Sequence, residues 1–340
     1  MSEMPEVQVT STEPKPTPPV VPADAELIVE TRGLIKRYGK LTAVNNMDLS
    51  VPRGAIYGFV GPNGAGKTST MRIITTLMLP SAGQAFVAGH EVTKAPRAVR
   101  RVIGYMPDYF GVYDDMKVWE YLDFFAACYD IPEADRPQMI ADLLDLVDLS
   151  HRRDDMVDKL SRGMKQRLCL ARTLVHDPQV LILDEPASGL DPRARVEIRE
   201  LMVELANMGK TIFFSSHILA DVAEICTHIG IVEAGQIVMQ GSMDEVRRRI
   251  SPNREAIVTL LDKADEAKVV LGALNGVLEV TDLPDEAGRK RIKVTFSGDD
   301  QLLSDLVTAL AAKSIPMLNF AEQTQDLESV FLKVTKGIVT

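Results

Sequence analysis

Apolar runs and segments of helical periodicity alternate along the first two thirds of the chain. Residues 55–60 form an apolar run that ends at a Gly-rich turn, and residues 68–77 after that turn have helical character. A strand, a Gly-rich turn and a helix make a βα unit, which is typical of the α/β class. Residues 180–183 are wholly apolar, as expected of a parallel strand buried on both faces. Further strands are predicted at 27–32, 211–215 and 229–233.

A helical subdomain is predicted at about residues 109–170, within the α/β domain. Apolar positions recur at helical spacing in 118–129 and 139–149, and no strand signal separates these segments. Four aromatic residues in the first segment either pack the core of this subdomain or form a contact surface for another protein: Trp119, Tyr121, Phe124 and Phe125.

The last quarter of the chain has a different order of elements. A βαββαβ order predicts a small α+β domain of the ferredoxin-like type. Its strands are expected at 256–261, 277–282, 291–297 and 316–321, and its helices at 265–274 and 300–312. A last helix is predicted at 327–334.

Three parts of the chain follow from these patterns. Residues 1–25 contain six prolines and little apolar surface, which predicts a disordered tail, with a docking peptide as the alternative. Residues 26–250 form the α/β domain, which closes with a helix whose Ser242 and Glu245 make an S-x-x-E capping box. Residues 255–340 form the second domain after a Ser-Pro-Asn linker.

Composition narrows the classes of partner. The formal net charge is −10, which disfavours a nucleic acid because such binding depends on Lys and Arg neutralising phosphates. The N-terminus has no signal-peptide pattern, and no apolar stretch approaches the roughly 20 residues that cross a bilayer. Three scattered cysteines with no C-x-x-C pair indicate buried thiols in a reducing compartment.

The strongest chemical signal is a phosphate-binding loop. Its sequence G-x-x-x-x-G-K-T lets backbone N–H groups wrap a phosphate at the start of a helix. The alternative, an ordinary Gly-rich turn, is disfavoured by the strand before it and the helix after it. Lys67 is expected to reach the β- and γ-phosphates, and the Thr68 hydroxyl to bind Mg²⁺. The nucleotide-binding loop comprises Gly61, Pro62, Asn63, Gly64, Ala65, Gly66, Lys67, Thr68 and Ser69.

Two carboxylates follow the apolar strand at 180–183. Ligands of α/β sheets bind at the carboxyl ends of the strands, where Asp184 and Glu185 are expected to lie. Asp184 is predicted to hold Mg²⁺, and Glu185 to orient and deprotonate the attacking water. The alternative is a pair of acids that caps the next helix.

Three weaker signals accompany this pair. Ser161 and Gly163 lie in the segment 160–167, where Ser161 is expected to open a helix; a helix N-terminus with a free hydroxyl is either a plain N-cap or an anion site. His217 follows a predicted strand on the same edge as the phosphates, where it is either structural or part of the site. Tyr38 lies upstream, where its ring could stack on a base.

Taken together, these motifs resemble those of the ATP-binding cassette family of P-loop NTPases over about residues 27–245. Residues 61–68 look like Walker A, 181–185 like Walker B, 160–164 like the signature motif, 189–191 like the D-loop and His217 like the switch histidine. The resemblance implies a head-to-tail dimer that binds two ATP molecules with Mg²⁺. Each ATP would then contact Lys67 of one chain and Ser161 and Gly163 of the other.

Two departures from the family pattern refine this expectation. Arg162 and Met164 replace the third and fifth signature residues, and Asp108 stands where the family has the Q-loop glutamine. Asp108 is therefore a candidate Mg²⁺ ligand that can only accept hydrogen bonds. The signature variant and residues 325–332 resemble the cassette subunits of ABC-2 type exporters. The resemblance implies an ATPase homodimer on the cytoplasmic face of the membrane, coupled to a separate permease subunit; the alternative is a soluble cassette ATPase that acts on ribosomes or DNA.

Overall fold

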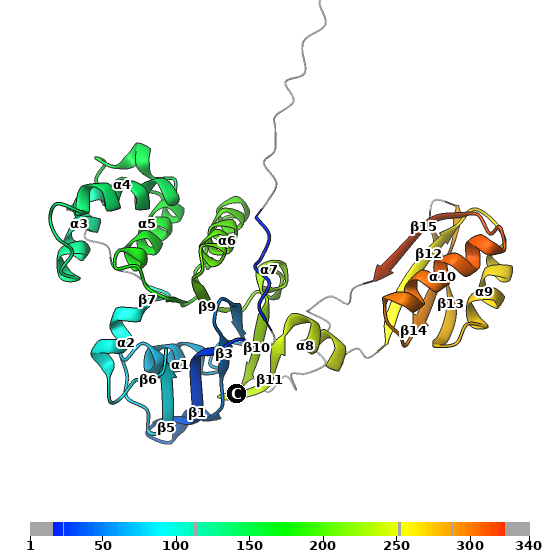
Figure 1. The fold of residues 1–340 in the computed structure, drawn as a ribbon, viewed down its shortest axis with the longest axis horizontal. Helices are drawn as coiled ribbons and strands as arrows, with labels where there is room; N and C mark the ends of the chain where they lie inside the picture. The colour runs from blue at the N-terminus through cyan, green and yellow to red at the C-terminus, as the bar shows by residue number, and fades with distance from the viewer. Residues whose placement is uncertain are drawn as a thin grey trace, which may run out of the picture. The chain divides into compact units, whose positions relative to one another are not determined.

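The computed structural model describes residues 16–22, 24–109, 111, 115–250, 253–286 and 288–323. The chain divides into two compact units between Gly241 and Ser242 (Figure 1). This boundary groups helix α8 (Met243–Ile250) with the C-terminal unit, whereas the sequence pattern placed this helix at the end of the first domain.

A six-stranded sheet forms the centre of the first unit, in the order β11-β10-β4-β9-β8-β7. The strand pairs from β10 to β7 are all parallel, and the residues of β4, β8 and β9 are buried throughout. Because these strands are parallel, their carboxyl ends meet at one edge of the sheet. The strands are β4 (Ile56–Val60), β7 (Ile103–Met106), β8 (Val180–Leu183), β9 (Thr211–Ser216), β10 (His228–Glu233) and β11 (Gln236–Ser242).

An antiparallel sheet lies beside this central sheet, and the sequence pattern located only its first strand. One buried cluster joins the two sheets through α1 (Lys67–Ile74), with Val29, Met71 and Phe213 among its members. The antiparallel strands are β1 (Leu27–Tyr38), β2 (Leu41–Met47), β3 (Ser50–Pro52), β5 (Ala82–Val87) and β6 (His90–Glu91).

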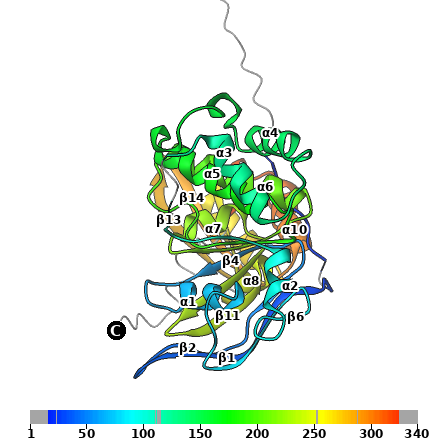
Figure 2. The same cartoon turned by 90° about the vertical axis from the view of Figure 1, so that its left-hand side faces the viewer.

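The helices of the first unit fall into two groups. Helices α3 (Val118–Cys128), α4 (Arg136–Leu146) and α5 (Arg162–Leu174) contact one another at the end of the unit away from β1 and β2 (Figures 1 and 2). The short 3₁₀ helices η1 (Ser150–Arg152) and η2 (Val157–Lys159) lie between α4 and α5 in the chain. The second group comprises the remaining helices, which are α1, α2 (Pro96–Val102), α6 (Pro192–Asn207) and α7 (Leu219–Ile225).

The C-terminal unit has the ferredoxin-like strand order. Its four strands pair antiparallel in the order β13-β14-β12-β15, with two helices packed into the same buried core. Hydrogen bonds from the Ser242 and Glu245 backbone N–H groups form the capping box at the start of α8. The predicted helix at 327–334 and the segment 325–332 lie outside the described residues. The elements are β12 (Arg254–Leu260), α9 (Ala264–Gly272), β13 (Val277–Glu286), β14 (Arg289–Phe296), α10 (Asp300–Ala312) and β15 (Met317–Gln323).

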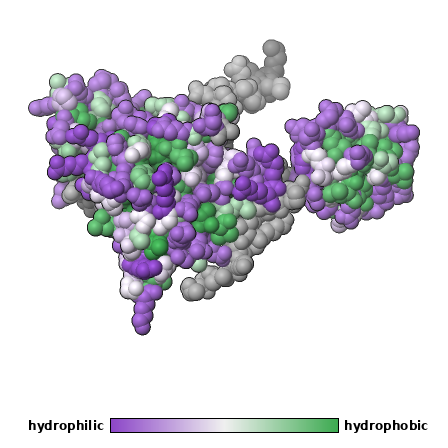
Figure 3. All heavy atoms as spheres, turned by 60° about the horizontal axis from the view of Figure 1, so that its bottom comes forward, coloured by the Kyte–Doolittle hydropathy of each residue, from purple (hydrophilic) through white to green (hydrophobic). Residues whose placement is uncertain are grey.

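The N-terminal tail is only partly described. Residues 1–15 and 23 lie outside the described residues, while residues 16–22 have neither helix nor strand. The amide of Asn207 on α6 donates to the carbonyl oxygen of Thr17 at 3.0 Å. Within the described part of the chain, no helix combines the length and apolar character that a membrane span needs. The face in Figure 3 is largely hydrophilic, with apolar patches on both units.

Candidate active site

The phosphate-binding loop connects β4 to α1, and its backbone geometry requires glycine at two positions. Gly66 has a φ of +97°, and a Cβ added there would lie 2.3 Å from the carbonyl oxygen of Ala43. A Cβ on Gly61 would lie 2.3 Å from the carbonyl oxygen of Val232. Gly66 is the N-cap of α1 and no side chain caps the helix, so the first N–H groups of α1 are available to an anion.

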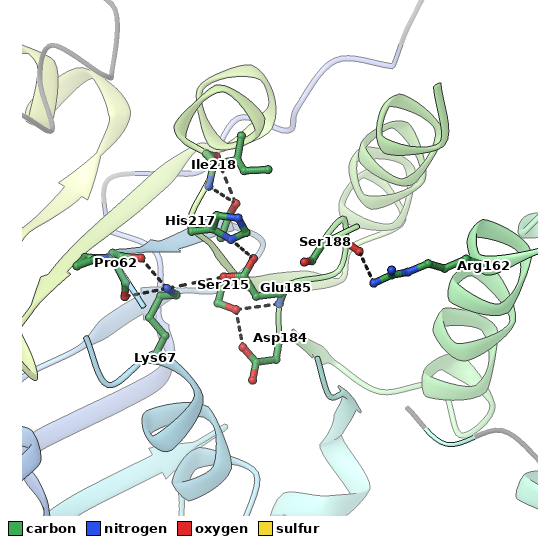
Figure 4. Close-up of polar contacts among 11 residues, drawn as sticks. Pro62, Lys67, Arg162, Asp184, Glu185, Ser188, Ser215, His217 and Ile218 are labelled. Carbon is green, nitrogen blue, oxygen red and sulfur yellow. Dashed lines mark hydrogen bonds and ion pairs between the residues drawn. The ribbon is translucent and has the colours of Figure 1, made fainter. Parts of the chain in front are cut away.

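Lys67 is held inside this loop. Its side chain is 7% exposed, and Nζ donates to the carbonyl oxygens of Gly61 at 2.6 Å and Pro62 at 3.3 Å (Figure 4). Nζ also lies 3.7 Å from Oε1 of Glu185. Burial lowers the pKa of the Lys67 ammonium, and the Glu185 and Asp184 carboxylates oppose that shift. The structure therefore places the loop and the carboxylate pair at the same site.

Asp184 is fully buried at the end of β8. Its Oδ1 accepts a hydrogen bond from the Ser215 hydroxyl at 2.6 Å, whereas Oδ2 has no hydrogen-bond partner among the described residues. Burial raises the pKa of the Asp184 carboxyl, the Ser215 hydrogen bond and the Thr68 side chain lower this pKa, and the Asp108 and Glu185 charges raise it. Thr68 and Asp108 are thus near enough to affect the Asp184 carboxyl.

Glu185 has an unusual backbone conformation, and both its backbone and its side chain have polar partners. Its φ of +51° lies in the left-handed region that residues other than glycine rarely adopt. The Glu185 N–H donates to Ser215 Oγ at 2.9 Å, and Oε2 lies 2.8 Å from His217 Nδ1 (Figure 4). Such strain is typical of functional sites, where the surrounding contacts hold the residue in place.

A cavity of about 520 Å³ is lined by most of the predicted site residues, although not by Gly61, Asp184, Ser161 or Gly163. Tyr38 lies at this cavity with 43% of its surface exposed, and its hydroxyl is 3.3 Å from Ser69 Oγ. Asp108, two residues after β7, also lines the cavity. The volume falls in the range of small-molecule sites. The other lining residues are Leu41, Ala43, Pro62, Asn63, Gly64, Ala65, Gly66, Lys67, Thr68, Ser69, Glu185, Ser188 and His217.

Ser161 and Gly163 lie elsewhere. They line a second cavity of about 410 Å³ together with Gly189, Leu190 and Asp191, and the two cavities have no lining residue in common. Ser161 is the N-cap of α5, where its Oγ accepts from the Met164 N–H at 3.3 Å. The predicted N-cap is therefore present, but within one chain Ser161 does not line the cavity of about 520 Å³ that contains Lys67, called the Lys67 cavity below.

Sequence reasoning missed the role of Ser215. This residue bonds both to the Asp184 carboxylate and to the Glu185 N–H because β9 pairs directly with β8. The only signal in the sequence was its position two residues before His217, at the end of an apolar strand.

Comparisons with known proteins agree with this geometry. Residues 44–188 match the family model described as ABC transporter. The daunorubicin resistance ATP-binding protein DrrA3 of Streptomyces coeruleorubidus is 32% identical over 92% of this chain and 96% of its own length. The linearmycin resistance ATP-binding protein LnrL of Bacillus subtilis is 28% identical over 91% of this chain and 98% of its own length. The bacitracin transport ATP-binding protein BcrA of Bacillus licheniformis is 37% identical over 72% of this chain and 78% of its own length.

A solved structure of an ATP-binding subunit of an ABC transporter superposes with a TM-score of 0.60. The two are 30% identical, and the match covers 65% of this chain and 92% of that chain. The match covers 78–98% of the length of the three relatives, and the fold, the phosphate-binding loop and the carboxylate pair are all present. The chain therefore belongs to the ABC transporter family, as an ATP-binding subunit that hydrolyses ATP.

Proposed function

We propose that this chain is the energy-coupling subunit of an ABC-2 type exporter. Three relatives are named for resistance to daunorubicin or linearmycin or for transport of bacitracin, which supports an export function. The catalytic part of the proposal rests on the position of the Glu185 carboxylate. Its Oε1 lies 3.7 Å from Lys67 Nζ, and its Oε2 lies 2.8 Å from His217 Nδ1.

Each group in the Lys67 cavity has a role in this proposal. The loop N–H groups and the Lys67 ammonium bind the phosphates, and the Tyr38 ring stacks on the base. Glu185 accepts the proton of the attacking water, since its side chain is 17% exposed and so within reach of solvent. His217 keeps the Glu185 carboxylate oriented and interacts with the charge that develops on the γ-phosphate.

The residues at the end of β8 fit a magnesium ion. The buried Oδ2 of Asp184 lacks a hydrogen-bond partner among the described residues, and Thr68 and Asp108 line the same cavity as the neighbouring Glu185. A hard cation prefers such carboxylate and hydroxyl oxygens. Thr68, Asp184 and Asp108 would hold the ion, which when bound neutralises phosphate charge.

A homodimer of this chain would complete the nucleotide site. Because Ser161 and Gly163 line a different cavity from Lys67, one phosphate group reaches both sets only when they come from two chains. In a head-to-tail pair, the N-terminus of α5 of one chain would cover the ATP of the other. ATP closes such a pair only if it binds the closed state more tightly than the open state.

The helical subdomain is the surface we assign to the permease. Tyr121 is fully buried and packs inside the subdomain, whereas Phe124 is 40% exposed. The Phe125 ring contacts the Phe124 ring edge to face, with 5.2 Å between the ring centroids. Phe125 also lines a cavity of about 320 Å³ with Tyr129 and Arg172. We infer that an apolar segment of a membrane subunit contacts Phe124 and Phe125 and that the chain works on the cytoplasmic face of the membrane.

The Glu185→Gln variant tests the ATPase and the dimer together. We expect it to bind ATP, to hydrolyse it at a small fraction of the normal rate and to accumulate as a dimer, because the base is lost while the binding groups remain. Light scattering in saturating ATP measures the dimer, and ADP serves as the control. A monomer under these conditions would contradict the sandwich arrangement.

Purification of the chain from its native membrane tests the transport part. A polytopic membrane protein is expected to copurify with it. Copurification of ribosomes or DNA in its place would contradict the export function and leave the ATPase assignment intact.

A further inference from the structure

Helix α5 contacts the turn that follows Glu185 at two points. The Gln166 side-chain amide donates a hydrogen bond to the carbonyl oxygen of Pro186. The Arg162 guanidinium donates from Nη2 to the carbonyl oxygen of Ser188 at 3.3 Å (Figure 4). Arg162 and Gln166 are four residues apart, so they lie on the same side of the helix. Both side chains therefore bind the backbone of the turn formed by residues 186–188.

The Gln166 contact is buried and lies next to the strained residue. Gln166 is 4% exposed, and its partner Pro186 directly follows Glu185. The same turn returns a hydrogen bond to Glu185, because the Ser188 N–H donates to the Glu185 carbonyl oxygen at 3.1 Å. A left-handed backbone at a residue other than glycine persists only where its surroundings hold it. The Gln166 bond is one such restraint.

The Arg162 contact links the cavity that contains Ser161 to the cavity that contains Lys67. Arg162 lines the cavity that contains Ser161 and Gly163, whereas its partner Ser188 lines the Lys67 cavity. The guanidinium lies against Gly189, where an added Cβ would be 2.4 Å from Nη2. Gly189 also has a φ of +69°, so both the backbone conformation and the nearby guanidinium disfavour any other residue at this position.

We propose that Arg162 and Gln166 are positioning residues that fix Glu185 through the turn at 186–188. Neither side chain lines the Lys67 cavity, so neither acts on the nucleotide bound by its own chain. They connect the N-terminus of α5, which carries Ser161 and Gly163, to the carboxylate that accepts the proton. A displacement of α5 would therefore move this turn and change the position of Glu185. The inference rests on the proposed function, because it takes Glu185 as the base.

Gln166→Met and Arg162→Met test the two contacts separately, since methionine keeps much of the side-chain volume without a donor. We expect Gln166→Met to lower kcat about 10- to 100-fold, as small misplacements of catalytic groups do. Arg162→Met should lower kcat by a smaller factor because its bond is exposed, and Arg162→Lys should recover part of the loss. KM and the affinity for a fluorescent ADP analogue should stay within about twofold, because the binding groups are untouched.

Two control variants remove comparable bonds that do not reach the turn. Thr173→Val deletes a buried bond to Leu170 within α5, and Arg136→Met deletes a bond to the carbonyl oxygen of Ile131 in the helical subdomain. Both should leave kcat near normal. A loss of kcat in these controls equal to that in the test variants would indicate general destabilisation and contradict the proposal.

A double-mutant cycle with Glu185→Gln separates the inference from the function on which it rests. If Gln166 acts through Glu185, Gln166→Met should have little further effect on the residual rate of Glu185→Gln. Equal losses in both backgrounds would overturn the inference but not the function. Normal turnover of Glu185→Gln alone would overturn the function. If Gln166→Met does not fold, as judged by circular dichroism, the same cycle with the exposed Arg162 decides.

Discussion

The Ser215 hydroxyl joins both carboxylate residues of the site, so its removal is an informative perturbation. Ser215 is fully buried; it donates to Asp184 Oδ1 at 2.6 Å and accepts the Glu185 N–H at 2.9 Å. In Ser215→Ala the Asp184 oxygen and the Glu185 N–H both lose their partner. The contacts to Lys67 and His217 involve the Glu185 side chain, and the Ser188 N–H bond holds its carbonyl oxygen, so none of them replaces the restraint on the Glu185 N–H.

The size of the effect follows from these two bonds. A hydrogen bond to a charged group contributes about 1.5–3 kcal/mol, and a buried N–H left unpaired costs about 1–3 kcal/mol. These terms share one side chain, so we expect the free energy of unfolding to fall by about 2–4 kcal/mol in total. We also expect kcat to fall at least about tenfold, because Glu185 is then less well fixed.

The pH dependence gives a second signature. Burial raises the pKa of Asp184 in the folded protein, and the Ser215 hydrogen bond opposes that rise. Removing the hydroxyl raises the folded pKa further, so the loss of stability is greatest at neutral pH, where Asp184 is charged. The loss should shrink as pH falls through the raised pKa, because the protonated carboxyl costs less to bury.

Urea denaturation followed by circular dichroism measures the stability, and phosphate release measures kcat. Ser216→Ala is the matched control, since its hydroxyl makes only local bonds with Ile218 and its removal should cost about 1 kcal/mol. A Ser215→Ala protein that loses no more stability than Ser216→Ala, with a loss that does not shrink on acidification, would refute the reasoning.

Three further substitutions probe the same cavity. Lys67→Ala should abolish phosphate release while the fold is kept, and near-normal release would contradict the assignment of the loop. His217→Ala should slow hydrolysis about 100-fold, the scale of one acid–base or orienting group; an unchanged kcat would return His217 to a structural role. Asp184→Asn removes a buried charge whose pKa is raised, so the nucleotide-free protein should be more stable at neutral pH while magnesium-dependent turnover is lost. Thermal melts with and without Mg²⁺ measure the stability, and an Asp184→Asn protein that is less stable than the unchanged protein at neutral pH would contradict this expectation.

Elements whose causes are local could be predicted from the sequence. The strand at 180–183 was predicted with its observed bounds because each residue is apolar and buried on both faces. The N-cap at Ser161 and the capping box at Ser242 are present because a single side chain satisfies each helix start. Helix α4 begins three residues before the predicted start, at Arg136, since the proline at its first turn is a start signal that the apolar spacing does not contain.

Elements that depend on distant partners could not be predicted. Strands β5 and β6 contain or border Gly83 and Gly89, which suggest turns, and they are strands because β1 pairs with β5. The bridge from Ser215 to Asp184 and Glu185 depends on the pairing of β8 with β9, which no local pattern specifies. For the same reason the sequence named the signature residues but did not show that α5 binds the turn after Glu185.

The adjacent acids of the site show how one turn gives two carboxylates different chemistry. In a continuing strand, successive side chains point to opposite faces of the sheet. The left-handed φ at Glu185 ends that alternation directly after β8, so the two acids enter different surroundings at one edge. Asp184 is buried with an unpartnered oxygen, which suits a metal ligand, whereas Glu185 lies partly exposed between a cation and an imidazole, which suits a base. Different environments for neighbouring acids are how a site assigns different roles to the same functional group. The strain at Glu185 is therefore part of the mechanism, and the contacts from Ser215, Gln166 and Arg162 maintain it.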